Sequence, residues 1–134
     1  PEVSTLIDKE KESKLNDFKT YKYFEEKIDF FKKNLLMSLD KIDRKICVGY
    51  GASASSTTLI HHFELQNYIN YLVDDNPAKI GTYSPGLNIP VKDSKVIDDN
   101  VDVIIILAWR YANQIKTKHS EYKGRFVVPM NIEN

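Results

Sequence analysis

The sequence predicts an α/β domain with a Rossmann-like, three-layer parallel sheet, preceded by a long N-terminal amphipathic helix. The first observation is a short apolar run, Ile46-Cys-Val48, followed at once by Gly49-x-Gly51-x-x-Ala54. The second is that apolar segments of strand length alternate with helical segments through the rest of the chain. Such alternation is typical of a parallel sheet that is covered on both faces.

The third observation is a helical pattern over residues 1–40. Apolar residues recur there every three or four positions, at Leu15, Phe18, Tyr21, Phe24, Ile28, Phe31, Leu35 and Leu39. Val3, Leu6 and Ile7 indicate a short first helix or an extended arm. The stripe has two interpretations, packing on the sheet of its own domain or joining this domain to another one upstream, and both can hold together.

The next segments form the entry to a βα unit. We expect a strand over 45–48, a tight turn made by Gly49 and Gly51, and a helix from Ser55 to Phe63. The small residue Ala54 is expected to let this helix pack closely on the strand. Tyr68 to Val73 is rich in β-forming residues and predicts a second strand, which ends at Asp74-Asp-Asn-Pro77.

The remaining segments continue the alternation. We expect one helical turn over 77–80, a loop from Gly81 to Pro90 and a short strand around 89–91. A brief helix capped by Asp93 or Ser94 runs to Ile97, and the apolar segment 101–107 predicts a central strand. A helix over 109–122 and a strand over 125–129 complete the pattern.

Composition excludes several classes of function. The 134 residues carry 19 Lys and Arg against 19 Asp and Glu, so no basic surface indicates nucleic acid as a partner. No apolar stretch approaches the ~18 residues of a membrane span. The N-terminus has no signal-peptide pattern, and the single cysteine, Cys47, lies in an apolar strand, so a cytoplasmic protein is expected. Because the chain begins without Met, we expect it to be part of a longer protein.

The start of the first βα helix is the best candidate for a binding site. Hydroxyl groups gather there on Ser53, Ser55, Ser56, Thr57 and Thr58. Together with the N–H groups of the helix N-terminus, they suit phosphate oxygens, although Ser and Thr are also ordinary N-caps. No Walker lysine accompanies the glycines, so nucleoside triphosphate hydrolysis is not expected.

Two other places carry candidate ligand-binding residues. Asp74 or Asp75 ends the second strand, where dinucleotide sites place an acid against a ribose hydroxyl; an Asx turn into Asn76 is the alternative. Trp109 and Arg110 end the central strand and can stack on and ion-pair with a ligand, or the tryptophan can simply close the sheet edge.

No catalytic or metal-binding set is predicted. His61 and His62 are adjacent and therefore point in different directions on a helix, and His119 is far away in the sequence. No nucleophile stands next to a base, since Gly-Ala-Ser53-Ala-Ser is not a Gly-x-Ser-x-Gly elbow. The pattern indicates binding rather than catalysis.

Several motifs in register resemble a known family, the C-terminal domain of SAM-dependent sugar C-methyltransferases. These enzymes methylate ring carbons of nucleotide-linked keto-deoxysugars. The motifs are Gly49-Tyr-Gly-Ala-Ser-Ala-x-x-x-Thr58-Leu, Val73-Asp-Asp-Asn-Pro-x-Lys79-x-Gly81, Ser84-Pro-Gly86-x-x-Ile89-Pro-Val91, Ile106-Leu-Ala-Trp109 and Phe126-Val-Val-Pro129. Upstream, Val3-x-x-Leu6 and Tyr23-Phe24 also match. The family commonly has Lys-Gly in place of Ser55-Ser56, and often Asn in place of Arg110.

The resemblance implies a substrate-side domain that holds a nucleotide-diphosphate sugar so that its ring carbon faces SAM. A zinc-binding domain and a SAM-binding domain would precede it, supply both cofactors and carry the base chemistry, so that this fragment is inactive alone. Matching positions are Gly49, Tyr50, Gly51, Ala52 and Ser53 in the glycine motif and Asp74, Asp75, Asn76 and Lys79 in the second motif.

The predicted organisation is therefore a helical segment over 1–44, which links to an upstream SAM-binding domain of the same chain, and a Rossmann-like domain over 45–134. Two alternative functions stay open. A stand-alone NAD-type binding or sensing module agrees with the glycine turn and the acid at 74 or 75. A structural docking domain agrees with the aromatic stripe over 18–39.

Overall fold

The computed structural model describes residues 2–42 and 46–130. The chain divides into two compact units, Pro1–Asn34 and Leu35–Asn134. Helix α1 (Val3–Glu12) and most of helix α2 (Phe18–Asp40) belong to the first unit. The division predicted from the sequence, at residue 44, stays a prediction, and Lys45, the expected first residue of the first strand, lies outside the described residues.

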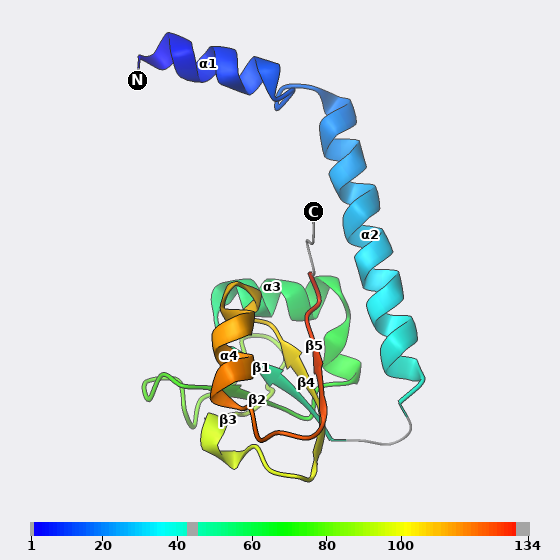
Figure 1. The fold of residues 1–134 in the computed structure, drawn as a ribbon, viewed down its shortest axis with the longest axis vertical. Helices are drawn as coiled ribbons and strands as arrows, with labels where there is room; N and C mark the ends of the chain where they lie inside the picture. Colours follow the sequence, from blue (N-terminus) through cyan, green and yellow to red (C-terminus); the bar gives the residue numbers. More distant parts are fainter. Residues whose placement is uncertain (1, 43–45, 131–134) are drawn as a thin grey trace. The chain divides into compact units, whose positions relative to one another are not determined.

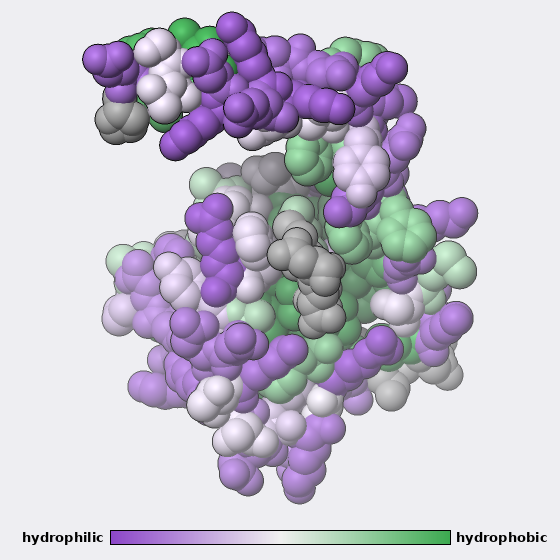
Figure 2. Space-filling view, turned by 45° about the horizontal axis from the view of Figure 1, so that its top comes forward, coloured by the Kyte–Doolittle hydropathy of each residue, from purple (hydrophilic) through white to green (hydrophobic). Residues whose placement is uncertain are grey.

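The helical pattern over 1–40 forms two helices. Lys14 has a φ of 54°, in the left-handed region, so α1 ends just before it. Asp17 then caps α2, because its carboxylate accepts the backbone N–H of Lys19 at 2.9 Å. The apolar stripe is exposed at its beginning, with Phe18 79% exposed. Figure 2 shows such apolar side chains among hydrophilic ones on the N-terminal helices.

The second unit is built on a five-stranded parallel sheet with the order β3-β2-β1-β4-β5 (Figure 1). Its strands are β1 (Ile46–Tyr50), β2 (Tyr71–Asp74), β3 (Val91–Asp93), β4 (Val101–Ile106) and β5 (Arg125–Val127). Its helical segments are α3 (Ala54–His62), α4 (Ala112–Lys118) and the 3-10 turns η1 (Leu65–Asn67), η2 (Ser94–Val96) and η3 (Trp109–Tyr111). The Rossmann-like parallel α/β fold predicted from the sequence is confirmed.

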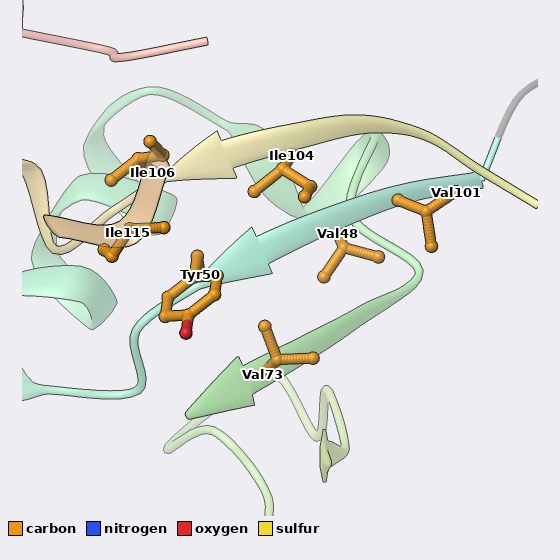
Figure 3. Close-up of a cluster of buried hydrophobic side chains, with 7 residues drawn as sticks. All are labelled: Val48, Tyr50, Val73, Val101, Ile104, Ile106 and Ile115. Atoms are coloured by element: carbon orange, nitrogen blue, oxygen red, sulfur yellow. The ribbon is translucent and has the colours of Figure 1, made fainter. Parts of the chain in front are cut away.

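Alternate residues of β1 face the two sides of the sheet. Val48 and Tyr50 join a buried cluster with Val73, Val101, Ile104, Ile106 and Ile115 of α4 (Figure 3). Gly49 lies on the opposite face, against Ile69, Leu72 and Leu107. Because β1→β2 and β4→β5 run in opposite directions across the sheet, right-handed crossovers place α3 and α4 on opposite faces.

The last turns of α2 are part of the second unit. Leu35 and Leu39 are buried, and the Asp40 carboxylate accepts the Tyr68 hydroxyl at 2.6 Å. Tyr68 does not begin β2, as the sequence suggested, because the chain first forms η1, with the Tyr68 and Ile69 N–H groups bonded to Leu65. The strand therefore starts at Tyr71.

Two residues of the glycine motif have roles other than those predicted. Gly49 lies within β1, paired with Leu72 and Ile105, and not in the turn. A Cβ there would come within 2.6 Å of the Leu72 side chain, so the strand needs glycine for packing. Ala54 is exposed, whereas Ser56 is the buried residue at the start of α3.

The remaining boundaries differ mainly at helix and strand ends. The helix expected over 109–122 consists of η3 and α4 and ends at Lys118, because Tyr122 turns back and its ring packs against Phe126 at 5.0 Å. Asp93 caps η2, accepting the Lys95 N–H at 2.9 Å. Strand β3 begins at Val91 and β5 ends at Val127.

Candidate functional site

A cavity of about 470 Å³ lies at the carboxyl ends of β1, β2 and β4. Ligands of open parallel α/β sheets bind at this edge, where the strand order reverses. The reversal here is at β1, from which the chain moves to β2 on one side and later to β4 on the other. The cavity size falls in the range of about 300–1,000 Å³ that is typical of small-molecule sites.

The turn after β1 forms one wall of the cavity. Gly51 has a φ of 107°, which favours glycine, and its N–H donates to the Val73 carbonyl at 2.8 Å. A Cβ at Gly51 would lie 2.8 Å from the Cβ of Ala108. The turn therefore requires glycine both for its backbone conformation and for its close contact with the end of β4.

Asp74, at the end of β2, holds this turn in place. Its carboxylate accepts the N–H of Ala52 at 2.8 Å and the N–H of Asn76 at 2.9 Å, and it pairs with the Lys79 ammonium at 3.1 Å. Although burial acts in the opposite direction, these bonds lower the pKa of Asp74 below its ordinary value. Asp74 is thus an ionised structural partner of the glycine turn, and the Asx turn at Asn76 is present.

Helix α3 begins directly at the cavity. Ser53 is the N-cap, because its hydroxyl accepts the Ser56 N–H at 3.2 Å. The same hydroxyl lies 2.9 Å from the hydroxyls of both Ser55 and Ser56. Thr57 bonds back to the Ser53 carbonyl at 3.3 Å, so its hydroxyl serves the helix. Ser53 and Ser55 line the cavity, and Ser56 is buried behind them.

The opposite wall comes from η3. The N–H groups of Leu107 and Ala108 both donate to the Tyr50 carbonyl, at 2.9 and 3.0 Å, and fix the end of β4 against β1. Trp109 and Arg110 follow, with the guanidinium carbon 5.2 Å from the centre of the tryptophan ring. This distance is within the range of a cation–π contact. An aromatic surface and a cation therefore face the cavity.

Asp75 points into a second polar cluster, which joins β1 and β2 to η2 and α4. The carboxylate accepts the Tyr50 hydroxyl at 2.9 Å and also bonds to Ser94 and to the Lys118 ammonium. His119 Nε2 lies 3.2 Å from the Tyr50 oxygen, and the two rings meet edge to face. Because the Tyr50 proton goes to Asp75, His119 donates here.

The titration of this cluster follows from its contacts. Burial opposes ionisation of Asp75, but the bonds from Lys118, Ser94 and Tyr50 lower its pKa below the ordinary value. Burial raises the pKa of Tyr50, and burial together with Lys118 lowers the pKa of His119. At neutral pH the cluster therefore holds one ion pair between Asp75 and Lys118, a neutral tyrosine and a neutral histidine.

Within residues 2–42 and 46–130, no three His, Cys, Asp or Glu side chains gather where they could hold a metal ion. In the same ranges, no helix has the length and apolar character needed to cross a bilayer.

Comparison with protein families matches residues 1–131 to the C-methyltransferase C-terminal domain. The chain belongs to this family. Comparison with curated proteins gives no match. The resemblance predicted from the sequence motifs is thereby confirmed, and the cavity described above is the candidate site of a C-methyltransferase C-terminal domain.

The C-methyltransferase C-terminal domain brings most of its predicted site residues together. The predicted residues that line the cavity are Tyr50, Gly51, Ser53, Ser55, Asp74, Asp75, Lys79, Trp109 and Arg110. The predicted residues outside its lining are Gly49, Ala52, Ser56, Thr57 and Asn76. The first packs inside the sheet, and the others support the turn or the helix start.

The structure adds residues that the sequence did not indicate. Leu107, Ala108, Tyr111 and Ile115 complete the lining. Ser94 and Lys118 bond to Asp75, and His119 contacts Tyr50. The position of Tyr111, two residues after Trp109, was a usable signal, because both follow the central strand. Nothing in the sequence links Lys118 to Asp75, since 43 positions separate them.

Proposed function

We propose that this domain binds the nucleotide-diphosphate sugar that a C-methyltransferase acts on, in the cavity at the carboxyl ends of β1, β2 and β4. We also propose that the sugar of this ligand is a keto-deoxysugar. SAM would bind an upstream domain of the same chain. In this arrangement the domain positions substrate and does not carry out methyl transfer itself.

The proposal rests on two kinds of chemical group that line the cavity together. The start of α3 presents the Ser53 and Ser55 hydroxyls, and η3 presents Trp109 and Arg110. Oxygen-rich anionic groups suit the first wall and the guanidinium, whereas a flat base suits the aromatic rings. A nucleoside diphosphate combines both chemical classes in one molecule.

The contacts of Asp74 disfavour the alternative of an NAD-type module. Such a module needs an acid at the end of β2 that accepts hydrogen bonds from the ribose. Of the two candidate acids, Asp74 already accepts bonds from Ala52, Asn76 and Lys79. Asp75 already accepts bonds from Tyr50, Ser94 and Lys118. The docking-domain alternative depends on the exposed stripe of α2 and makes no use of the cavity.

Trp109 provides a direct assay, because it is the single tryptophan of the chain. We would titrate the chain with UDP-glucose, dTDP-glucose, NAD and SAM, and follow tryptophan fluorescence together with calorimetric heat. Binding of a nucleotide sugar should change the fluorescence of Trp109, whereas SAM should not bind. Binding of NAD alone would favour the sensing module, and no binding of any of the four would contradict the proposal.

Ser55→Glu locates the site. Ser55 is exposed at the first turn of α3, where a carboxylate stabilises the helix but repels a diphosphate. We expect nucleotide-sugar affinity to fall at least tenfold with no loss of stability. Thr58→Glu is the matched control, because it places the same charge on an exposed position of α3 outside the cavity lining, and it should bind normally.

A further inference from the structure

The charged side chains around the cavity differ in whether a carboxylate already neutralises them. Lys79 pairs with Asp74 at 3.1 Å, and Lys118 pairs with Asp75. Arg110 lines the cavity, as Lys79 does, and no Asp or Glu of the described ranges pairs with it. An entering anion would therefore find one cation whose charge is not yet balanced.

The glycine turn is a weaker place for an anion than its sequence suggests. The Ala52 N–H donates to the Asp74 carboxylate, and the Ser56 N–H donates to the Ser53 hydroxyl. The negative charge of Asp74 thus lies next to the turn, where it repels a phosphate. The positive charge of Lys79 is already neutralised by its ion pair with Asp74. The attraction for a diphosphate consequently lies on the η3 side of the cavity.

The contacts of Arg110 leave its guanidinium available to bind a phosphate. Its guanidinium lies 5.2 Å from the centre of the Trp109 ring, and a guanidinium next to an aromatic ring keeps N–H donors for a bidentate bond to phosphate. The backbone that carries both residues is fixed, because Leu107 and Ala108 donate to the Tyr50 carbonyl and Tyr111 donates to Ala108.

We propose that Arg110 binds the diphosphate of the ligand and makes the cavity selective for nucleoside diphosphates over uncharged nucleosides. The inference rests on the proposed function for the class of ligand, and it adds the residue that decides the affinity. Its distinguishing feature is that the main anion contact comes from η3 after β4 and not from the glycine turn after β1.

The test compares Arg110→Ala and Arg110→Lys with Arg125→Ala, which removes an exposed arginine of β5 outside the cavity lining. Calorimetry would measure the binding of UDP, dTDP, uridine and thymidine to each protein. We expect Arg110→Ala to lose about 10- to 100-fold in affinity for the diphosphates, as for a lost bond to a charged group. Affinity for the nucleosides should stay within twofold.

The other variants sharpen the comparison. Arg110→Lys should recover part of the affinity, because an ammonium keeps the charge but lacks the planar fork. Arg125→Ala should bind like the unchanged chain. Added salt should weaken UDP binding to the unchanged chain more than binding to Arg110→Ala, because the exposed cation is screened.

The outcomes separate this inference from the proposed function. If the unchanged chain binds the diphosphates and Arg110→Ala binds them within twofold of it, the inference is wrong and the proposed function stands. If Arg110→Ala weakens the binding of nucleosides and of diphosphates equally, Arg110 does not bind the phosphates, and the inference is again wrong. If the unchanged chain binds no diphosphate or nucleotide sugar, both fail.

Discussion

Replacing Asp74 with Asn should destabilise the domain in a way that depends on pH. The carboxylate accepts two backbone N–H groups, from Ala52 and Asn76, and pairs with Lys79. An asparagine has one acceptor oxygen, so it can keep the Asn76 bond, but its amide N–H₂ then faces the Ala52 N–H. One part-buried donor, the Ala52 N–H, and the Lys79 ammonium lose their partner.

The magnitude follows from these losses. A buried donor left without a partner costs about 1–3 kcal/mol. The Asp74 side chain is 13% exposed and that of Lys79 is 34% exposed, so solvent reduces the contribution of the ion pair. We therefore expect the free energy of unfolding to fall by about 1–2 kcal/mol at pH 7.

The sign of the pH dependence follows from the lowered pKa of Asp74. A carboxyl whose pKa is lower in the folded state contributes stability above its unfolded pKa, which is about 4, and loses that contribution as the pH falls through the folded value. The difference between the unchanged chain and Asp74→Asn should accordingly be constant from pH 7 to about 5 and shrink below about 4.

Urea denaturation followed by circular dichroism from pH 7 to pH 3 measures this difference. Asp99→Asn is the matched control, because its side chain is 79% exposed and lies 4.0 Å from an exposed lysine. It should change stability by less than about 0.5 kcal/mol. Equal stability of Asp74→Asn and the unchanged chain at pH 7, or a difference that persists unchanged in acid, would refute the role assigned to Asp74.

Two further predictions concern the glycine turn and the cysteine. Gly51→Ala should lower the free energy of unfolding by about 2 kcal/mol or more, because of its φ of 107° and the close contact with Ala108. Gly81→Ala should lower it by about 1 kcal/mol, because its φ is 82° but the space around its Cβ is open. Urea denaturation measures both, and the reverse ranking would contradict this prediction. Burial raises the pKa of Cys47 to about 12, so a thiol reagent at pH 8 should react only as the chain unfolds; immediate reaction of the native chain would show an accessible thiol.

The sequence predicted the fold well where local chemistry decides it. The apolar run of β4 and the glycine after β1 are visible in the sequence, and the structure forms both. The Ser and Thr cluster suggested a helix cap without identifying it, and the cap is Ser53. The predictions were less accurate at boundaries that depend on tertiary contacts. Tyr68 has strand propensity, but its hydroxyl bonds to Asp40, and its backbone closes η1.

The position of Gly49 shows a related limit. A glycine pair after an apolar run suggests that both residues form the turn. Only the contacts of Leu72, Leu107 and Ile69 reveal that the first glycine is required inside the sheet. Sequence alone does not give the distance from a strand to the side chains of the neighbouring strands, so this role could not be predicted.

The two neighbouring aspartates are the clearest case. In the sequence they are equivalent candidates for one ribose contact, but successive side chains along an extended chain point to opposite faces. Asp74 accordingly bonds to the turn that precedes α3, whereas Asp75 bonds to Tyr50 and to Lys118 at the end of α4. Each carboxylate fixes one helix to the sheet edge, and each already has a lysine. If the cavity binds a ligand as we propose, we therefore expect its recognition to depend mainly on groups other than these two acids.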